Sequence, residues 1–192
     1  MQTGKYDGIV LAGGAGRRLG GAHKPGLVVG DRSLLDVSID ALVGAATTIV
    51  AGPTQPTQRA VRWVCETPPG GGPVAALAAG LRSVTAPAVV VLAADLPFVT
   101  AKAVQQLVDG LGTAAAAVAV DDAGRDQPLL ACYRSVALSA ALPASPTGEA
   151  MRTVTTRLAA AGEIHRLRLD TDPPATVDCD TAADLARARE LT

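Results

Sequence analysis

Residues 9–20 read IVLAGGAGRRLG, a short apolar run that turns directly into a loop rich in glycine and arginine. The run starts with two β-branched residues and stops at a glycine, which is typical of a buried strand. Glycines let a loop turn tightly and point bare N–H groups at phosphate oxygens, while nearby cations neutralise the phosphate charge. The stretch therefore predicts a strand that carries a phosphate-binding loop at its end.

Strand patterns and helix patterns alternate along the rest of the chain. Strands are expected at residues 9–12, 47–51, 61–65, 88–93, 114–120, 128–133 and 164–169, and helices at 33–45, 73–84, 100–111, 151–161 and 181–190. Ser33 and Thr181 are expected to cap their helices, and Pro73 suits a first helical turn. The alternation predicts an α/β fold in which a mostly parallel sheet is covered by helices on both faces, as one three-layer domain over residues 1–192.

Ligands of such sheets bind beyond the carboxyl ends of the strands. The loops that follow Leu11, Val50, Cys65 and Ala93 are therefore the first places to look for a binding site.

Composition narrows the class of protein. The chain has 192 residues, of which 48% are hydrophobic and 18% charged, and its formal net charge is -1. This balance fits a globular core and argues against a protein that coats nucleic acid. Three cysteines far apart and two histidines predict neither a disulfide framework nor a zinc site. Without an apolar leader or a membrane-length apolar run, we expect a cytoplasmic protein with no membrane partner.

Spacing decides between phosphate-loop types. A dinucleotide fingerprint that starts at Gly14 would need glycine at position 19, where Leu19 stands. A Walker A loop would need serine or threonine after its lysine, but Lys24 precedes Pro25. Neither pattern fits.

A third pattern matches. The string Leu-Ala-Gly-Gly-x-x-x-Arg-x-Gly from residue 11, followed by Lys24, resembles the signature loop of nucleotidyltransferases that act on sugar phosphates and pterin cofactors. Its double arginine and Gly20-Gly21 resemble more narrowly the molybdenum cofactor guanylyltransferase family. The resemblance implies a Rossmann-like nucleotidyltransferase (nucleotide-diphospho-sugar transferase) fold. It also implies that the loop grips the nucleotide through Leu11, Ala12, Gly13, Gly14, Gly16, Arg17, Arg18 and Lys24.

Two acids are candidates for a metal site. Asp95 follows the Val-Val-Val strand directly, where a carboxylate could share Mg²⁺ with a bound triphosphate. By resemblance, its Asp-x-Pro context supplies the metal ligand, and Lys24, Arg18 and Asp95 are the catalytic residues. Asp180 stands where the family often carries Asn-x-Asn-Thr, so it is a second metal candidate. The alternative for Asp180 is an ordinary acid at a helix start.

Three further segments carry weaker signals. The segment before residue 73 can wrap a base or ribose, and resemblance places Glu66, Gly71 and Gly72 against the nucleoside. Arg125, Gln127 and Arg152 are candidates for acceptor binding, because guanidinium groups suit phosphate oxygens. Solvent-exposed surface arginines are the alternative for Arg125 and Arg152.

The resemblance implies a reaction that needs no catalytic triad. GMP would pass from GTP to the terminal phosphate of molybdopterin, with Mg²⁺ as cofactor and pyrophosphate as the leaving group. Transient contact with molybdenum-insertion enzymes or molybdoenzyme clients is expected as well. Three alternatives stay open: a cytidylyltransferase for the same pterin, a sugar-phosphate nucleotidyltransferase, and a non-catalytic nucleotide- or pterin-binding module. The last is favoured by His23, which stands where the family usually has an acid.

Overall fold

A computed structural model of the chain describes residues 6–13 and 26–191. The strands are β1 Tyr6–Leu11, β2 Val28–Val29, β3 Arg32–Ser33, β4 Thr48–Ala51, β5 Arg62–Val64, β6 Ala88–Ala93, β7 Ala116–Val120, β8 Asp126–Arg134 and β9 Ile164–Leu167. The helices are α1 Leu34–Ala41, α2 Pro73–Leu81, α3 Ala101–Leu111, α4 Ser135–Ala141, α5 Met151–Ala161 and α6 Ala182–Glu190.

Seven strands form one sheet in the order β5-β4-β1-β6-β8-β7-β9. Strands β5, β4, β1 and β6 run parallel to one another, as do β7 and β9. Strand β8 runs antiparallel to both of its neighbours, β6 and β7. The predicted α/β fold with a mostly parallel sheet is confirmed, with β8 as the reversed strand.

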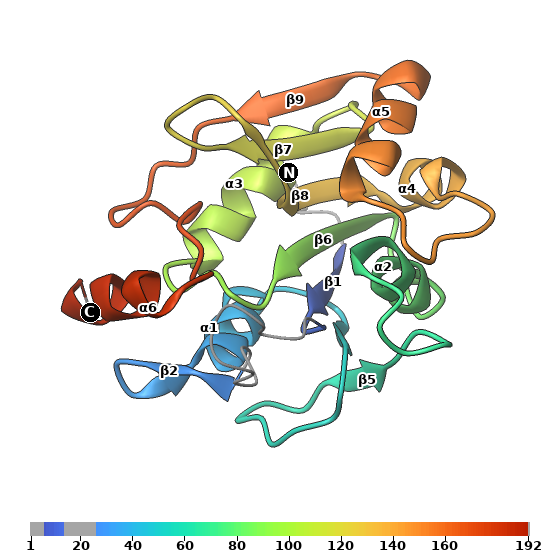
Figure 1. Ribbon diagram of the computed structural model, residues 1–192. Coiled ribbons are helices and arrows are strands. Elements are labelled where there is room, and N and C mark those ends of the chain that lie inside the picture. The colour runs from blue at the N-terminus through green and yellow to red at the C-terminus, as the bar shows by residue number, and fades with distance from the viewer. Residues whose placement is uncertain (1–5, 14–25, 192) are drawn as a thin grey trace.

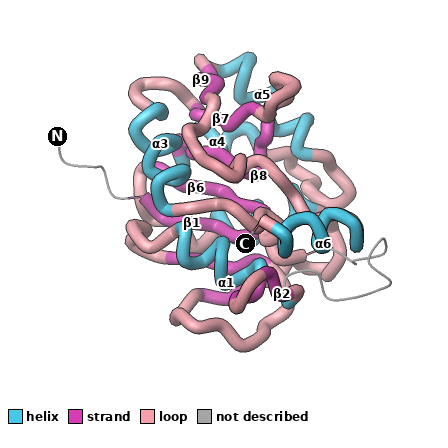
Figure 2. The backbone as a smooth tube through the Cα atoms, turned by 90° about the vertical axis from the view of Figure 1, so that its left-hand side faces the viewer, coloured by secondary structure: helices cyan, strands magenta, loops and turns pink. Residues whose placement is uncertain are grey.

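Helices cover both faces of this sheet (Figures 1 and 2). Alternate residues of β1 divide between two cores: Val10 packs with α1 and α3, while Ile9 and Leu11 pack with α2, α4 and α5. Strand β6 is buried along nearly its whole length, which explains its continuous valine run. Helix α6 packs instead near β2, in a third small core that includes Phe98 and Leu185.

The expected helix starts are confirmed. The Ser33 hydroxyl accepts a hydrogen bond from the Asp36 N–H, and Pro73 occupies the first turn of α2. Thr181 forms a capping box with Asp184 at the start of α6.

The β2–β3 hairpin and α4 were not predicted from the sequence. Each hairpin strand is two residues long, which is too short for an alternation pattern. Helix α4 has no side-chain cap, so it lacks the usual start signal. Within the described ranges, no helix combines the length and apolarity needed to cross a bilayer.

One buried acid ties the start of β1 to the chain before β6. Asp7 is fully buried, and its Oδ2 accepts hydrogen bonds from the N–H groups of Thr85 (2.8 Å) and Ala86 (2.9 Å). A single carboxylate therefore satisfies two backbone donors that the fold removes from water.

Replacing this acid tests the fold. We expect Asp7→Ala to lower the free energy of unfolding by about 2–4 kcal/mol, because two buried N–H groups lose their acceptor. Urea denaturation of the variant measures the loss. Asp122→Ala, at an exposed loop position, is the control and should stay within about 0.5 kcal/mol of the parent. A loss below about 1 kcal/mol for Asp7→Ala would contradict the assigned role.

Candidate functional site

The carboxyl ends of the central strands meet at one edge of the sheet. The Ala12 N–H donates to the Ala51 carbonyl (2.9 Å), and the Ala94 N–H donates to the Leu11 carbonyl (3.1 Å). A Cβ on Gly52 would lie 2.9 Å from the Ala12 backbone, so the chain after β4 packs directly against the chain after β1. Residues 11–13, which begin the signature loop, therefore lie between the segments that follow β4 and β6.

The remainder of the signature loop is not part of the described ranges. Gly14, Gly16, Arg17, Arg18 and Lys24 lie outside the described residues, as does His23.

Asp95 lies at the same edge, just beyond β6. Its backbone carbonyl accepts a hydrogen bond from the Cys179 N–H (3.0 Å), which brings the segment around residues 178–180 beside it. Thr100, not Asp95, caps α3, because the Thr100 hydroxyl accepts from the Ala103 N–H. At the start of α6 the capping box is formed by Thr181 and Asp184, directly after Asp180. The structure thus brings the two metal candidates into adjacent segments.

A cavity of about 210 Å³ opens beside Asp95 and is called the Asp95 cavity below. Its lining residues come from the end of β6, the start of β8, the first residue of α5 and the segment before α6. They are Ala93, Asp95, Leu96, Gln127, Pro128, Leu129, Leu130, Met151, Thr176 and Asp178. The cavity combines apolar walls with carboxylate and amide groups, which is the usual composition of a small-molecule site.

One wall of the Asp95 cavity is a bulge in β8. Val118 pairs with Ala131 while the next residue, Ala119, pairs with Gln127, so residues 128–130 fall out of the ladder with β7. The hydroxyl of Tyr133, a fully buried side chain, donates to the Pro128 carbonyl (2.7 Å). Burial raises the pKa of Tyr133 and keeps it protonated as a donor. Tyr133 therefore fixes the bulge whose residues face the cavity.

The three acceptor-binding candidates fall in different places. Gln127 lines the Asp95 cavity, and its amide nitrogen donates to an Asp121 oxygen (3.3 Å). Arg125 is exposed and bonds the same carboxylate through its N–H (2.8 Å) and Nε (2.7 Å). The Arg125 N–H bond is the main cause that lowers the pKa of Asp121. Arg152 is exposed in the first turn of α5. Neither arginine lines the cavity, so only Gln127 is brought to it.

The nucleoside candidates form a turn before α2. A Glu66 oxygen accepts from the Gly70 N–H (2.9 Å), and the Gly71 carbonyl accepts from the Gly148 N–H (2.8 Å). Gly72 stands at the helix N-cap with φ 89°, and no side chain caps the helix there. The first N–H groups of α2 are therefore not capped by a side chain, as at helix starts that bind anions.

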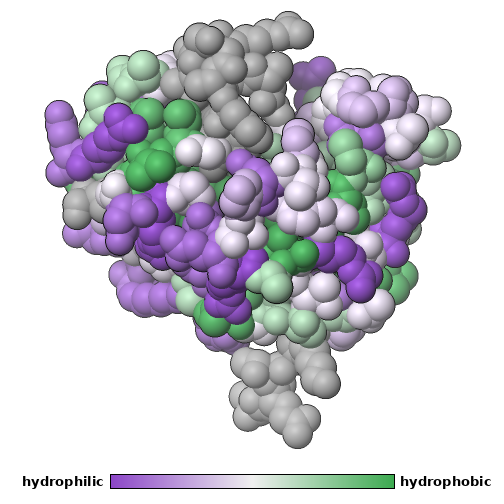
Figure 3. Space-filling view, turned by 90° about the horizontal axis from the view of Figure 1, so that it is seen from below, coloured by the Kyte–Doolittle hydropathy of each residue, from purple (hydrophilic) through white to green (hydrophobic). Residues whose placement is uncertain are grey.

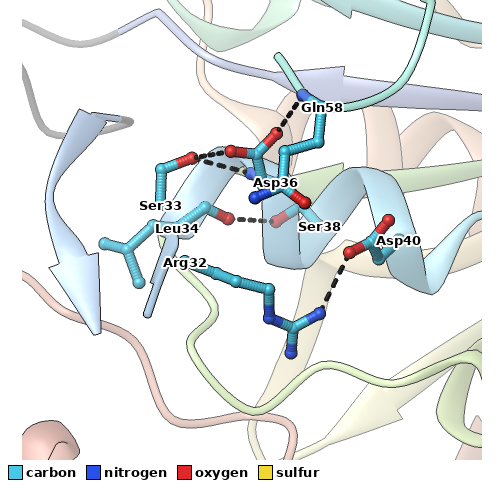
Figure 4. Close-up of polar contacts among 7 residues, drawn as sticks. All are labelled: Arg32, Ser33, Leu34, Asp36, Ser38, Asp40 and Gln58. Atoms are coloured by element: carbon cyan, nitrogen blue, oxygen red, sulfur yellow. Dashed lines mark hydrogen bonds and ion pairs between the residues drawn. The ribbon is translucent and has the colours of Figure 1, made fainter. Parts of the chain in front are cut away.

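Helix α1 contacts two of these edge segments, and Figure 4 shows the contact with the segment that follows β4. The Asp36 carboxylate accepts from the Ser33 hydroxyl (2.7 Å) and from the Gln58 N–H (3.0 Å), in the segment that follows β4. The buried Ser38 hydroxyl lies 3.2 Å from the Ala93 carbonyl, at the end of β6. Asp36 and Ser38 thus hold the segments on either side of residues 11–13.

These supporting residues were not singled out from the sequence, nor were Tyr133 and Thr176. For Ser38 a signal existed: it follows Leu34 by four residues, so it shares a helix face with an apolar residue. A polar residue at such a position predicts a buried hydrogen bond.

A family model described as the MobA-like NTP transferase domain matches residues 8–161. The chain belongs to this family. Within it, the chain is 29% identical over 144 residues to a probable molybdenum cofactor guanylyltransferase of Chloroflexus aggregans. That match covers 69% of this chain and 67% of the relative.

Two solved structures share the fold of this MobA-like transferase. One is molybdopterin-guanine dinucleotide biosynthesis protein A of Archaeoglobus fulgidus, with a TM-score of 0.70 at 21% identity, covering 96% of this chain and 97% of that one. The other is 2-C-methyl-D-erythritol 4-phosphate cytidylyltransferase of Thermus thermophilus. Its TM-score is 0.70 at 20% identity, and the match covers 95% of this chain and 96% of that one. The predicted nucleotidyltransferase fold is confirmed.

The donor groups of this MobA-like transferase suit a hard cation. In the described part of the chain, no three or more histidine, cysteine or acidic residues gather into a metal-binding group. Magnesium, unlike zinc, does not need three protein ligands, because one or two carboxylates together with substrate phosphates and water complete its coordination shell. Asp95 and Asp178 line the same cavity, so the structure brings two carboxylate residues to it.

The Asp36 contacts give a matched test within Figure 4. We expect Asp36→Ala to lower the free energy of unfolding by about 1–3 kcal/mol and to speed hydrogen exchange at the Gln58 amide, whose acceptor is removed. Asp40→Ala is the control, because among the described residues the Asp40 carboxylate bonds only the partly exposed Arg32 (3.0 Å). This variant should lower the free energy of unfolding by less than about 1 kcal/mol and leave hydrogen exchange at the Gln58 amide unchanged. Equal exchange at Gln58 in both variants would contradict the assignment.

Proposed function

We propose that this MobA-like transferase moves GMP from GTP to the terminal phosphate of molybdopterin, as a single cytoplasmic domain, forming molybdopterin guanine dinucleotide and releasing pyrophosphate. The observation that carries the proposal is the placement of Asp95. It lies beside the cavity and is bonded through its carbonyl to the segment of Asp178 and Asp180, one strand away from the start of the signature loop. The guanylyltransferase relative supports the choice of nucleotide and acceptor.

In this proposal, positioning and charge neutralisation account for the chemistry. The signature loop, with Arg17, Arg18 and Lys24, holds the triphosphate. Asp95 and Asp180 would hold Mg²⁺, and the ion would supply charge neutralisation at the nucleotide phosphates. A phosphate monoester is already an anionic nucleophile, so its oxygen attacks the α-phosphorus in line without a separate base. The bond to pyrophosphate breaks as the new P–O bond forms.

The two substrates would approach from different segments. The turn of Glu66, Gly71 and Gly72, with the uncapped start of α2, is proposed to hold the nucleoside. Gln127 and the apolar walls of the Asp95 cavity are proposed to hold the acceptor. Arg125 and Arg152, outside the cavity wall, are proposed to meet its phosphate from the surface. Contact with molybdenum-insertion enzymes or molybdoenzyme clients belongs to the same proposal.

One observation favours a second candidate, transfer of CMP from CTP. The cytidylyltransferase of Thermus thermophilus matches this chain with the same TM-score as the molybdopterin-guanine protein of Archaeoglobus fulgidus. The chemistry is the same for both nucleotides, and only the groups that contact the base and the acceptor differ.

Pyrophosphate release distinguishes these candidates. The purified chain is incubated with molybdopterin, Mg²⁺ and each of GTP, CTP, ATP and UTP. We expect kcat/KM for GTP to exceed that for CTP by at least about tenfold, equivalent to about 1.4 kcal/mol of transition-state discrimination. A preference for CTP would replace the guanylyl assignment. Nucleotide binding without turnover would favour a non-catalytic module.

Variants of the two acids test the metal assignment. We expect Asp95→Ala to reduce turnover at least about a hundredfold and to remove most Mg²⁺-dependent nucleotide binding, while the melting temperature stays close to that of the parent. Asp180→Asn is the matched variant, since it keeps an oxygen ligand but removes a charge. It should retain turnover and raise the Mg²⁺ concentration at half-maximal rate. Normal turnover by Asp95→Ala would show that the metal lies elsewhere.

A further inference from the structure

A second cavity of about 650 Å³ lies near the β2–β3 hairpin and is called the Phe98 cavity below. Its walls come from the hairpin, α1, residues 97–100, the start of α3, residues 170–173 and Leu191 near the C-terminus. The volume falls in the range of cavities that bind drug-sized groups. Among the residues that the structure describes, none of the nucleotide, metal or acceptor candidates lines it.

The floor of the Phe98 cavity is apolar, and apolar surface continues over its rim. Phe98 and Val37 are buried, whereas Leu191 in the wall is 55% exposed. On the lower face of the molecule, hydrophobic side chains occur in patches among hydrophilic ones (Figure 3). Apolar and charged side chains thus share the walls of this cavity, which is a usual composition of a binding site.

The charges around this cavity are unbalanced. Lys102 is paired with Asp170 (2.7 Å), and Arg32 is paired with Asp40 (3.0 Å). Asp31 and Asp172 also line the cavity, and neither forms a hydrogen bond or ion pair with any residue in the described ranges. Both cations in the lining, Arg32 and Lys102, are therefore paired within the protein, and the Arg189 Nε nearby donates to the Val28 carbonyl (3.1 Å). Among the lining residues, three carboxylates face two cations, which leaves a negative surplus.

The two cavities share the chain segments that form their walls. Residues 95 and 96 line the Asp95 cavity, and residues 97–100 continue into the Phe98 cavity. Thr176 and Asp178 line the first, while residues 170–173 of the same segment line the second. A group bound in the Phe98 cavity would therefore contact the segments that place Asp95.

We propose that the Phe98 cavity docks a segment of a partner protein in which an apolar side chain stands next to a lysine or arginine. The apolar side chain fills the hollow over Phe98, and the cation meets the carboxylates of Asp31 and Asp172. A protein segment is chosen over a small molecule because the wall residue Leu191 is 55% exposed and offers apolar surface at the mouth of the cavity. This inference is independent of which nucleotide the transferase uses.

Capped dipeptides serve as probes in an amide NMR titration of the full chain. Acetyl-Phe-Lys-amide should give saturable shift changes at residues 28–32, 97–102 and 170–173, with a dissociation constant in the millimolar range for so small a ligand. Acetyl-Phe-Glu-amide and acetyl-Ser-Lys-amide should bind at least about tenfold more weakly, because each lacks one of the two features.

Three results would overturn the proposal. They are the absence of saturable shifts with acetyl-Phe-Lys-amide, equal shifts with acetyl-Phe-Glu-amide, and tighter binding of phenethylammonium than of the dipeptide. The last result would assign the cavity to a small amphipathic cation instead of a protein segment.

Surface variants complete the test without disturbing the core. The double variant Asp31→Asn, Asp172→Asn should erase the preference for lysine over glutamate in the probe. Leu191→Ser should weaken binding severalfold, whereas Val136→Ser, at an 82% exposed position in α4, is the matched control and should bind like the parent. Parent-like preference in the double variant would show that these carboxylates do not select the ligand.

Discussion

The parallel run of β5, β4, β1 and β6 is the constraint on which the rest of the structure depends. Parallel strands must all end at the same edge, and their last backbone groups need partners there. The bonds from Ala12 to Ala51 and from Ala94 to Leu11 meet that need and hold three loops against one another. Residues 11–13 and Asp95 share this edge because they directly follow β1 and β6, and the Cys179 N–H joins its segment to them through the Asp95 carbonyl.

The sequence predicted the strands and helices that are marked by a local hydrophobic pattern or by a capping residue. The valine run of β6, the caps at Ser33 and Thr181 and the apolar stripe of α3 are local signals, and the structure confirms each. The reversal of β8 could not be predicted in this way. Its direction depends on pairing with β6 and β7 across the sheet, and an extended pattern carries no information on direction.

The candidate site likewise combines residues that the sequence indicates with contacts that only the structure reveals. Asp95 was expected at the end of a buried strand, and Gln127 was expected near the acceptor; the structure brings both to one cavity. Sequence could not show that Arg125 is held by Asp121, because that contact depends on the turn between β7 and β8. Nor could it show that the Tyr133 hydroxyl supports a bulge five residues earlier in the same strand. Such contacts depend on tertiary geometry, not on residue type or spacing.

The bulge in β8 has a consequence for how such a protein changes over time. Residues 128 and 129 pair with neither β6 nor β7, although the residues before and after them belong to the ladder. An insertion or deletion elsewhere in a buried strand turns every later side chain to the opposite face, and the core is lost. At this point the chain can gain or lose a residue while the flanking register is kept. The wall of the Asp95 cavity is therefore where a change in chain length alters the shape of the cavity at least cost to the fold.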